Sequence, residues 1–362
     1  TPAMAQISID YLATTPFARR PMLWLKLLSE NGGTISFSPT FGYDLCLRRS
    51  AKIDASQFEL AQWRIAGIGG EMVRANVLND FAARFAEAGF DGKAFLPSYG
   101  LAESTLAVSF PELSTGIKVD HVDRDAFART GMAVPATPNG NGSAEKIRTF
   151  VACGRALPGH QVEIRDPDNN RLPERAIGRV CITGPSLMQG YFRDLEATRA
   201  MMTQDGWLDT GDMGYMLDGE LVISGRSKDL IIHNGRNIWP QDLEWAVERL
   251  EGVRAGDVAA FAVSDEGEGE KVVVLVECRL SDDEARQTLR REIAATVHRS
   301  AGVNCEVVLT APRSLTFTSS GKLSRAAAKA DYLTGEVQDL AAETLLPAAE
   351  PALAGMVAGG RE

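Results

Sequence analysis

Hydrophobic positions in the first third of the chain alternate between helical and extended spacing. PMLWLKLLSE is amphipathic, TISFSPTF has an extended pattern, and NVLNDFAARFAEAGF again has helical spacing. In this last segment Val77, Phe81 and Phe85 recur at four-residue steps, and a short strand is predicted around Ala94–Leu96. Alternating helices and strands predict α/β layering over residues 1–110.

The pattern changes after residue 110. Residues 111–148 include PATPNGNGSAEK, which is rich in Pro, Gly, Asn and Ser, and we interpret them as an insertion with a flexible stretch. Residues 149–227 contain short strands such as QVEIRD, GRVCIT and ELVIS, bounded by Gly, Asp, Asn or Pro. This spacing is typical of a small β-rich subdomain.

The segment GRSKDLIIHNGRNIWPQDLE, residues 225–244, has a third pattern. It predicts a strand, a turn with paired charges, a second strand and a helix that begins near Pro240. The apolar positions Leu243, Val247 and Leu250 form a stripe along that helix. The turn has the composition expected between two domains.

The pattern beyond this helix predicts a compact α+β domain over residues 228–333. DVAAFAV and KVVVLVECRL read as strands, and Ser281 with Glu284 forms a capping box before a further helix. Residues 334–362 are rich in Ala, Gly and acidic residues and contain Pro347 and Pro351. They predict a tail or linker.

Composition narrows the possible partners. A chain of 362 residues is expected to form two or three domains. Its net charge of -10 disfavours nucleic acids and anionic membranes, so small molecules or proteins are the expected partners. The five cysteines lack a CxxC pair, which predicts reduced core residues. No apolar run reaches the roughly 20 residues that span a bilayer, and we expect a cytoplasmic protein.

Two short motifs in the first part of the chain carry candidate chemistry. Tyr99 and Glu103, in YGLAE, follow a predicted strand, and ligands of open α/β sheets bind at strand ends. An aromatic ring can stack on a base and a carboxylate can hold magnesium, although a buried tyrosine and a helix-capping glutamate fit equally well. The turn Gly69-Gly70-Glu71 could bring backbone close to the same base, but an ordinary turn is the favoured interpretation.

Three further residues have the chemistry to bind ribose and phosphate. Asp212, in GWLDTGDMGY, is predicted on a turn between glycines, where its carboxylate could accept hydrogen bonds from both hydroxyls of a ribose. An Asp-stabilised turn is an equal alternative. Arg226 could donate to ribose or phosphate oxygens, or pair with Asp229. Lys322, in TSSGKLSR, lies on a small flexible loop that could carry an ammonium group to a phosphate.

Together, these segments resemble a known superfamily. YGLAE, ITGPSLMQGY, DTGD, GRSKDLIIHNGRN and SSGKLSR occur in the order and spacing of the adenylate-forming enzymes, which include acyl-CoA synthetases, peptide-synthetase adenylation domains and luciferases. SFSPTFGYDLC, PSYGLAEST, VACGRALPGHQVEIRD and GRNIWPQDLE are most similar to the fatty acyl-AMP ligases. The resemblance covers nearly all of residues 1–333. It implies the C-terminal portion of the large domain, layered α/β plus a β-rich subdomain, followed by a mobile α+β domain.

The resemblance implies a role for each nucleotide-binding candidate. Tyr99 would stack on adenine, beside the turn Gly69-Gly70-Glu71, and Glu103 would be the magnesium ligand. Asp212 and Arg226 would hold the ribose.

The resemblance also implies roles in the other steps. Lys228 would be the hinge between domains, and Lys322 would bridge the carboxylate and the α-phosphate during adenylation. Phe41 and Tyr43 would lie near the acyl pocket. Ala102 stands where other superfamily members have threonine, and the acyl-AMP ligases share this alanine.

The implied reaction is the ATP-dependent and Mg²⁺-dependent activation of a medium-chain or long-chain fatty acid to acyl-AMP. The acyl group would pass to the phosphopantetheine thiol of an acyl carrier protein, such as one of a polyketide or non-ribosomal peptide synthase. The insertion expected in residues 111–148, for which an ordinary surface loop is the alternative, favours this acceptor over free CoA. An acyl-CoA ligase and a non-catalytic relative that binds nucleotide or carrier protein remain alternatives. The Ser/Thr/Gly-rich phosphate-binding loop is missing from the sequence, so we expect the N-terminal part of the large domain to be lacking.

Overall fold

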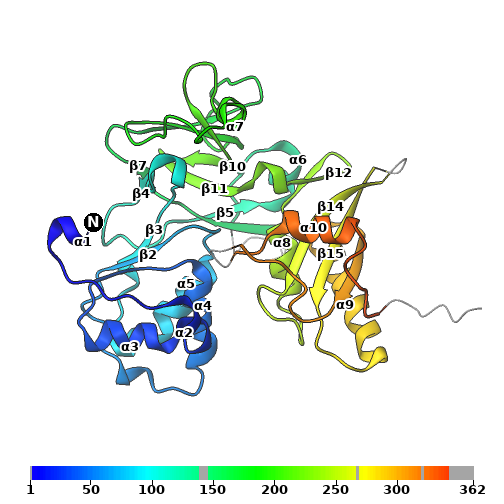
Figure 1. Ribbon diagram of the computed structural model, residues 1–362, viewed down its shortest axis with the longest axis horizontal. Helices are drawn as coiled ribbons and strands as arrows, with labels where there is room; N and C mark the ends of the chain where they lie inside the picture. The colour runs from blue at the N-terminus through cyan, green and yellow to red at the C-terminus, as the bar shows by residue number, and fades with distance from the viewer. Residues whose placement is uncertain (1, 138–145, 266–268, 319–321, 342–362) are drawn as a thin grey trace, which may run out of the picture. The chain divides into compact units, whose positions relative to one another are not determined.

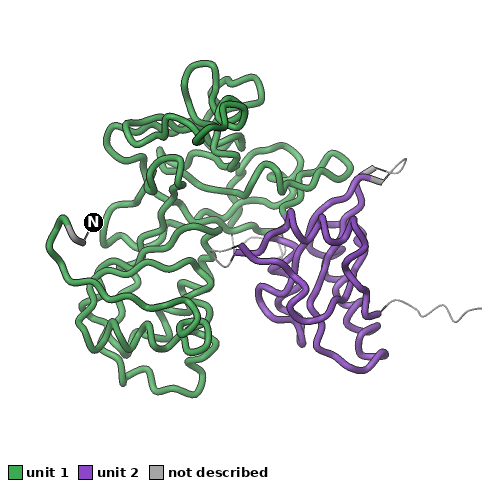
Figure 2. Tube along the Cα trace, in the orientation of Figure 1, with its two compact units in different colours: residues 1–239 green, residues 240–362 purple. Residues whose placement is uncertain are grey.

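The computed structural model describes residues 2–137, 146–265, 269–318 and 322–341. Contacts divide the chain into two compact units, Thr1–Trp239 and Pro240–Glu362, which are green and purple in Figure 2. The expected domain boundary at residues 227 and 228 falls in a short 3-10 helix of the first unit, η6 (Ser227–Asp229).

The first unit begins with an α/β layer around a three-stranded parallel sheet (Figure 1). The strands pair in the order β1-β2-β3. Parallel strands need long crossover connections, and helices α4 and α5 supply them. The α/β prediction is therefore confirmed. The elements of this layer are α1 (Pro2–Ala5), α2 (Thr14–Arg19), α3 (Met22–Glu30), β1 (Ile35–Phe37), α4 (Thr40–Ser50), β2 (Ile65–Ile68), α5 (Ala75–Arg84) and β3 (Phe95–Pro97).

One local prediction in this layer was wrong. The extended pattern over residues 34–41 forms a strand only in β1, and α4 begins at Thr40. Pro39 precedes the helix with extended backbone, at φ -59° and ψ 162°. A proline fixes its own φ and can stand directly before a helix, so the chain changes from strand to helix within a few residues.

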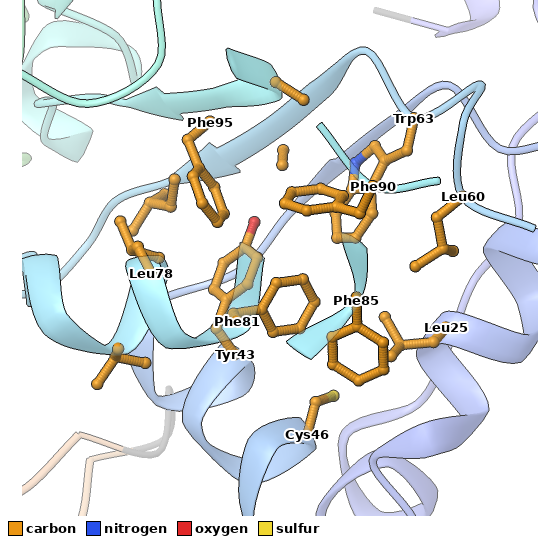
Figure 3. Packing of buried hydrophobic residues seen from close by; sticks show 14 of the residues in the cluster. Leu25, Tyr43, Cys46, Leu60, Trp63, Leu78, Phe81, Phe85, Phe90 and Phe95 are labelled. Atoms are coloured by element: carbon orange, nitrogen blue, oxygen red, sulfur yellow. The ribbon is translucent and has the colours of Figure 1, made fainter. Parts of the chain in front are cut away.

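Aromatic rings fill the space between this sheet and its helices (Figure 3). Tyr43, Trp63 and Phe81 are almost completely buried. The rings of Tyr43 and Phe81 have centroids 5.1 Å apart at 86°, and those of Phe81 and Phe90 are 5.3 Å apart at 88°. Such edge-to-face pairs add about 0.5–1.5 kcal/mol each beyond the burial of their area. This core holds α4 and α5 against the sheet and so fixes the end of β3.

The β-rich part of the first unit contains a four-stranded antiparallel sheet in the order β11-β10-β9-β8. The strands predicted from QVEIRD, GRVCIT and ELVIS are confirmed as β8, β9 and β11. A two-stranded sheet of β4 and β7 lies before it in the chain. The elements are β4 (Ser109–Phe110), β7 (Arg155–Ala156), β8 (Gln161–Arg165), β9 (Gly178–Thr183), α7 (Leu195–Met201), β10 (Leu208–Leu217) and β11 (Glu220–Arg226).

Residues 111–148, the expected insertion, contain regular structure. Strand β5 (Val119–Asp123) pairs with β6 (Ile147–Val151), and α6 (Arg124–Thr130) follows β5 directly. The predicted flexible stretch falls in residues 138–145, which lie outside the described residues.

Side chains from β5 and α6 belong to the core of the first unit. Asp120 is 7% exposed and accepts hydrogen bonds from the Tyr215 hydroxyl at 2.7 Å and from Arg175 Nη1 at 3.1 Å. The ring of Phe127 packs with Tyr215 and Trp239. These contacts connect β5 and α6 to β10 by both polar and apolar packing.

The segment 225–244 contains one strand more than predicted. After β11, strands β12 (Ile231–His233) and β13 (Arg236–Ile238) form a hairpin. Its turn residues Asn234 and Gly235 both have positive φ, 51° and 70°, as a two-residue turn of the Asn-Gly kind requires.

The second unit is a small α+β fold, as predicted. Strand β15 pairs antiparallel with β14 and parallel with β16. Leu243 and Val247 of the first helix are fully buried, which confirms the predicted stripe at these positions. The elements are α8 (Pro240–Val247), β14 (Val258–Asp265), β15 (Gly269–Glu277), α9 (Asp283–Ala301), β16 (Cys305–Thr310) and α10 (Arg325–Leu333).

Two features at the ends of these elements differ from the sequence pattern. The predicted capping box at Ser281 was wrong, because Asp282 caps α9 and accepts a hydrogen bond from the Ala285 N–H at 2.8 Å. In the expected tail, the Leu340 N–H donates to the Leu309 carbonyl at 2.7 Å, and Asp339 pairs with Arg290. Residues 342–362 lie outside the described residues.

The cysteines are free, and all except the half-buried Cys305 are buried, as predicted. Among the helices that the structure describes, none is both long and apolar enough to cross a membrane.

Candidate nucleotide site

Tyr99 lies just beyond the end of β3 and connects the parallel sheet to the β-rich part. It is 8% exposed, and its hydroxyl donates a hydrogen bond to Asp212 Oδ2 at 2.7 Å. Burial, followed by the negative charge of Asp212, raises the pKa of Tyr99 well above its usual value. The hydroxyl therefore stays protonated and acts as a donor to the carboxylate.

Asp212 lies inside strand β10 and not on a turn, which corrects the sequence prediction. The strand has an irregular register between Asp209 and Met213, and Gly211 has a φ of 70°. Such a bulge changes the direction of a side chain within a strand. The Asp212 N–H donates to Thr210 Oγ1 at 3.1 Å, which holds the local backbone.

Arg226 is the register partner of Asp212 across the β10 and β11 ladder. Its Nε lies 3.3 Å from Asp212 Oδ1. The structure thus brings Tyr99, Asp212 and Arg226 together, although Tyr99 and Asp212 are 113 positions apart in the chain. An aromatic ring, a carboxylate and a guanidinium in contact can offer stacking, acceptors for a diol and donors for phosphate oxygens.

Glu103 lies in a short 3-10 helix, η4 (Ala102–Ser104), a few residues beyond Tyr99. Its Oε1 accepts a hydrogen bond from the Tyr191 hydroxyl at 2.7 Å. This bond, with burial second, raises the pKa of Tyr191 to about 12. Sequence reasoning gave Tyr191 no role, although the residue ends the motif ITGPSLMQGY.

Polar contacts join the segments around Glu103 and Ser186. The Met188 N–H donates to the Glu103 carbonyl at 2.7 Å. The hydroxyls of Ser104 and Ser186 are 2.8 Å apart, and His160 Nε2 is 2.6 Å from Ser186 Oγ. Sequence reasoning missed His160 and Ser186, because neither lies near Glu103 along the chain.

Thr105, directly after η4, has φ 62°, an unfavourable value for a β-branched residue. Its Oγ1 donates to the Ser186 carbonyl at 3.1 Å, so contacts with the second segment hold the strained turn.

The turn Gly69-Gly70-Glu71 follows β2. A Cβ on Gly69 would lie 2.8 Å from Ser98 Oγ and 3.2 Å from the Ser98 carbonyl oxygen, so the turn approaches the end of β3 closely. Glu71 Oε1 accepts from the Phe41 N–H at 2.7 Å, in the first turn of α4. A carboxylate there satisfies a helical N–H that has no partner inside the helix. The adenine contact stays a prediction.

Phe41 and Tyr43, the predicted acyl-pocket residues, both lie on α4. Phe41 is partly exposed, whereas Tyr43 is fully buried and its hydroxyl donates to the Gly67 carbonyl at 3.2 Å. Their role in holding an acyl chain stays a prediction.

The two predicted lysines are exposed. Lys228 lies in η6, between β11 and β12. In the second unit, the Thr318 N–H donates to the Lys322 carbonyl at 2.8 Å and the Lys322 N–H donates to Thr318 Oγ1 at 3.1 Å. The hinge and bridging roles of these lysines stay predictions.

A magnesium ion would have few protein ligands at Glu103. The described residues contain no group of three or more His, Cys, Asp or Glu side chains able to hold a metal. Magnesium is commonly held by one or two carboxylates, together with substrate phosphates and water. A single carboxylate, with one oxygen already bonded to Tyr191, fits an ion held mainly by nucleotide phosphates.

The fold is that of an α/β protein, and comparison with known proteins gives its family. Residues 2–192 match the AMP-binding enzyme family, and the chain belongs to it.

Individual relatives narrow the resemblance. The chain is 48% identical over 340 residues to a putative acyl-CoA synthetase of Caulobacter vibrioides, covering 94% of this chain and 59% of the relative. It is 32% identical to the medium-chain-fatty-acid–[acyl-carrier-protein] ligase JamA of Moorena producens, and the match covers 92% of this chain and 58% of JamA. A structure from a study of fatty acyl-adenylate ligases of E. coli and L. pneumophila superposes with a TM-score of 0.85 at 46% identity. The match covers 93% of this chain and 60% of that structure's chain. The chain thus spans less than two thirds of these relatives.

Proposed function

We propose that the protein carrying this chain is a fatty acyl-AMP ligase, which activates a fatty acid with ATP and transfers the acyl group to a carrier-protein thiol. The observation that carries the proposal is the contact of Tyr99 with Asp212 and of Asp212 with Arg226. The similarity to fatty acyl-adenylate ligase structures supports the substrate class.

The contact geometry suits the adenosine part of ATP. The ring of Tyr99 would stack on adenine while its hydroxyl fixes Asp212. Each carboxylate oxygen of Asp212 has a second lone pair that can accept a ribose hydroxyl. Arg226 would add a charge-assisted hydrogen bond beside the carboxylate.

Adenylation joins two anions, so positive charge is its main requirement. The fatty-acid carboxylate attacks the α-phosphate in line, the bond to pyrophosphate breaks, and acyl-AMP forms. The Lys322 ammonium would neutralise charge between the carboxylate and the α-phosphate. Glu103, held by Tyr191, would bind magnesium, which supplies charge neutralisation at the phosphates.

The second step needs a thiol acceptor. Acyl-AMP is a mixed anhydride, and the thiol attacks its carbonyl carbon with loss of AMP. The name of JamA supports a carrier-protein phosphopantetheine arm, whereas the name of the Caulobacter relative favours free CoA as the second candidate. Rotation about Lys228 would withdraw Lys322 after adenylation and admit the thiol.

Fatty-acid-dependent ATP–pyrophosphate exchange tests adenylation, measured on the protein as its gene encodes it. We expect exchange with medium-chain or long-chain acids and its loss in Lys322→Ala. Lys329→Ala, a lysine on α10 of the same unit, is the matched control and should retain exchange. Nucleotide binding without any exchange would instead support a non-catalytic relative.

A competition assay separates the two acceptors. Equal concentrations of a phosphopantetheinylated carrier protein and CoA are offered after acyl-AMP has formed, and both thioesters are quantified. Predominant acyl-carrier product is expected, and predominant acyl-CoA would assign the protein to the CoA ligases.

A further inference from the structure

The segments around Glu103 and Tyr191 are joined by a set of contacts that suits the fixing of one carboxylate. Main-chain bonding sets the position of η4, because the Met188 N–H donates to the Glu103 carbonyl at 2.7 Å. The Tyr191 hydroxyl donates a hydrogen bond to Glu103 Oε1 at 2.7 Å. Both donors lie in the short segment 188–191, so the same segment holds the backbone and the side chain of Glu103.

Tyr191 is itself anchored. Its N–H donates to Thr198 Oγ1 at 2.9 Å, and the Thr198 hydroxyl donates to the Asp194 carbonyl at 2.7 Å. Gly190, with φ 152°, approaches Thr198 so closely that a Cβ would lie 2.9 Å from its Cγ2. The phenol is therefore supported by the start of α7, and its hydroxyl is presented to Glu103 from a fixed backbone.

We propose that Tyr191 is a positioning residue for Glu103. Its hydroxyl donates a hydrogen bond to Oε1 and so orients the carboxylate, which leaves Oε2 to bind the metal ion at the nucleotide phosphates. This inference rests on the proposed function, because it assigns the orientation of the same magnesium ligand. Partners that orient a metal-binding side chain commonly change metal affinity by about 10–100-fold when removed. Tyr191 acts only through Glu103 and touches no reacting atom.

Direct metal binding tests the role without relying on turnover. Mn²⁺ is titrated into the protein with a saturating nonhydrolysable ATP analogue, α,β-methylene-ATP, and free Mn²⁺ is followed by its electron paramagnetic resonance signal. In Tyr191→Phe we expect the apparent Kd for Mn²⁺ to rise by about 10-fold. Affinity for the analogue in the absence of metal should be unchanged.

A double-mutant cycle separates positioning from structural support. Glu103→Gln weakens metal binding on its own, and adding Tyr191→Phe to Glu103→Gln should have no further effect on the Kd. A purely structural tyrosine would weaken binding to the same extent in both backgrounds, which overturns the proposal. Thermal unfolding of each variant shows whether it is folded.

Tyr332→Phe is the matched control, because the Tyr332 hydroxyl also donates to a glutamate, Glu306 Oε2, at 2.9 Å. It should leave the Kd for Mn²⁺ at the wild-type value. If the wild type binds the analogue and Mn²⁺, and Tyr191→Phe binds both equally well, the positioning role is wrong while the proposed function stands. If the wild type binds no analogue, the proposed function itself fails, and the positioning role fails with it.

Discussion

At the residue scale, the chemistry of single side chains is set by what the fold places beside them. Tyr99 combines a buried ring with a hydroxyl bonded to Asp212, so the alternatives of a buried tyrosine and a ligand-stacking one are compatible. Asp212 receives Tyr99 on one oxygen and Arg226 on the other. A buried hydrogen bond to a charged acceptor contributes about 1.5–3 kcal/mol, so the contact of Tyr99 with Asp212 contributes to stability.

Tyr99→Phe removes the hydroxyl and keeps the ring. We expect the free energy of unfolding to fall by about 1.5 kcal/mol or more, because the buried contact to an ionised carboxylate is lost. Urea unfolding followed by fluorescence measures the change. Tyr11→Phe, at a tyrosine that is 86% exposed, should change stability by less than about 0.5 kcal/mol, and an equal loss in both variants would contradict the prediction.

The buried thiol of Cys153 should make the free energy of unfolding depend on pH in the alkaline range. Burial raises the pKa of its thiol from the usual 9.0 to about 12. Below pH 9 the folded and unfolded states both hold the proton, and the stabilising contribution is complete. As the pH rises towards 12, the unfolded thiol ionises while the folded one does not, so stability falls by up to about 1.4 kcal/mol per pH unit.

The Cys153→Ala variant isolates this contribution. Its unfolding free energy should fall less steeply than that of the wild type between pH 9 and pH 11, after correction for the difference measured at pH 7. Parallel curves would show that the thiol titrates alike in both states.

At the element scale, the sequence predicted the helices and strands with strong periodicity correctly, but it did not predict where α4 begins or which residue caps α9. Capping of α9 by Asp282 was missed because Ser281 and Asp282 are both good capping residues, and only the backbone path decides which one is used. Similarly, the hairpin of β12 and β13 depends on an Asn-Gly turn inside a segment whose pattern predicts a single strand.

The capping assignment is tested by two neighbouring substitutions. Asp282→Ala should destabilise the protein by about 1 kcal/mol, since the Ala285 N–H loses its acceptor. Ser281→Ala should change stability by less than about 0.5 kcal/mol. Denaturant midpoints at constant slope measure both changes. A larger loss of stability in Ser281→Ala than in Asp282→Ala would instead support the capping box at Ser281.

Packing between elements is tested in the aromatic core. Phe81→Ala should cost about 3–5 kcal/mol, because the ring is fully buried between Tyr43, Phe90 and Phe95. Phe192→Ala, at an 86% exposed phenylalanine, is the matched control and should have little effect on unfolding. Equal effects in the two variants would be inconsistent with this core.

At the scale of the whole molecule, the chain contains two units with separate cores. The second unit has its own sheet, and its Glu244 is 6% exposed by side chain and bonded to both Arg325 and the Ala260 N–H. A separate core and internally paired charges predict that residues 240–341 fold without the first unit. This fragment should show a cooperative thermal transition and dispersed amide resonances, and a spectrum typical of an unfolded chain would contradict the prediction.

The sequence by itself determined the order of helices and strands, the α/β and α+β character of the two parts, and the family, because periodic burial and short motifs are local in the chain. Only the tertiary structure decided that Asp212 lies on a bulged strand facing Tyr99, that Tyr191 holds Glu103, and that Tyr43 belongs to the aromatic core. These contacts join residues that are far apart in sequence. A hydrogen bond depends on position and direction in space, which local pattern does not encode.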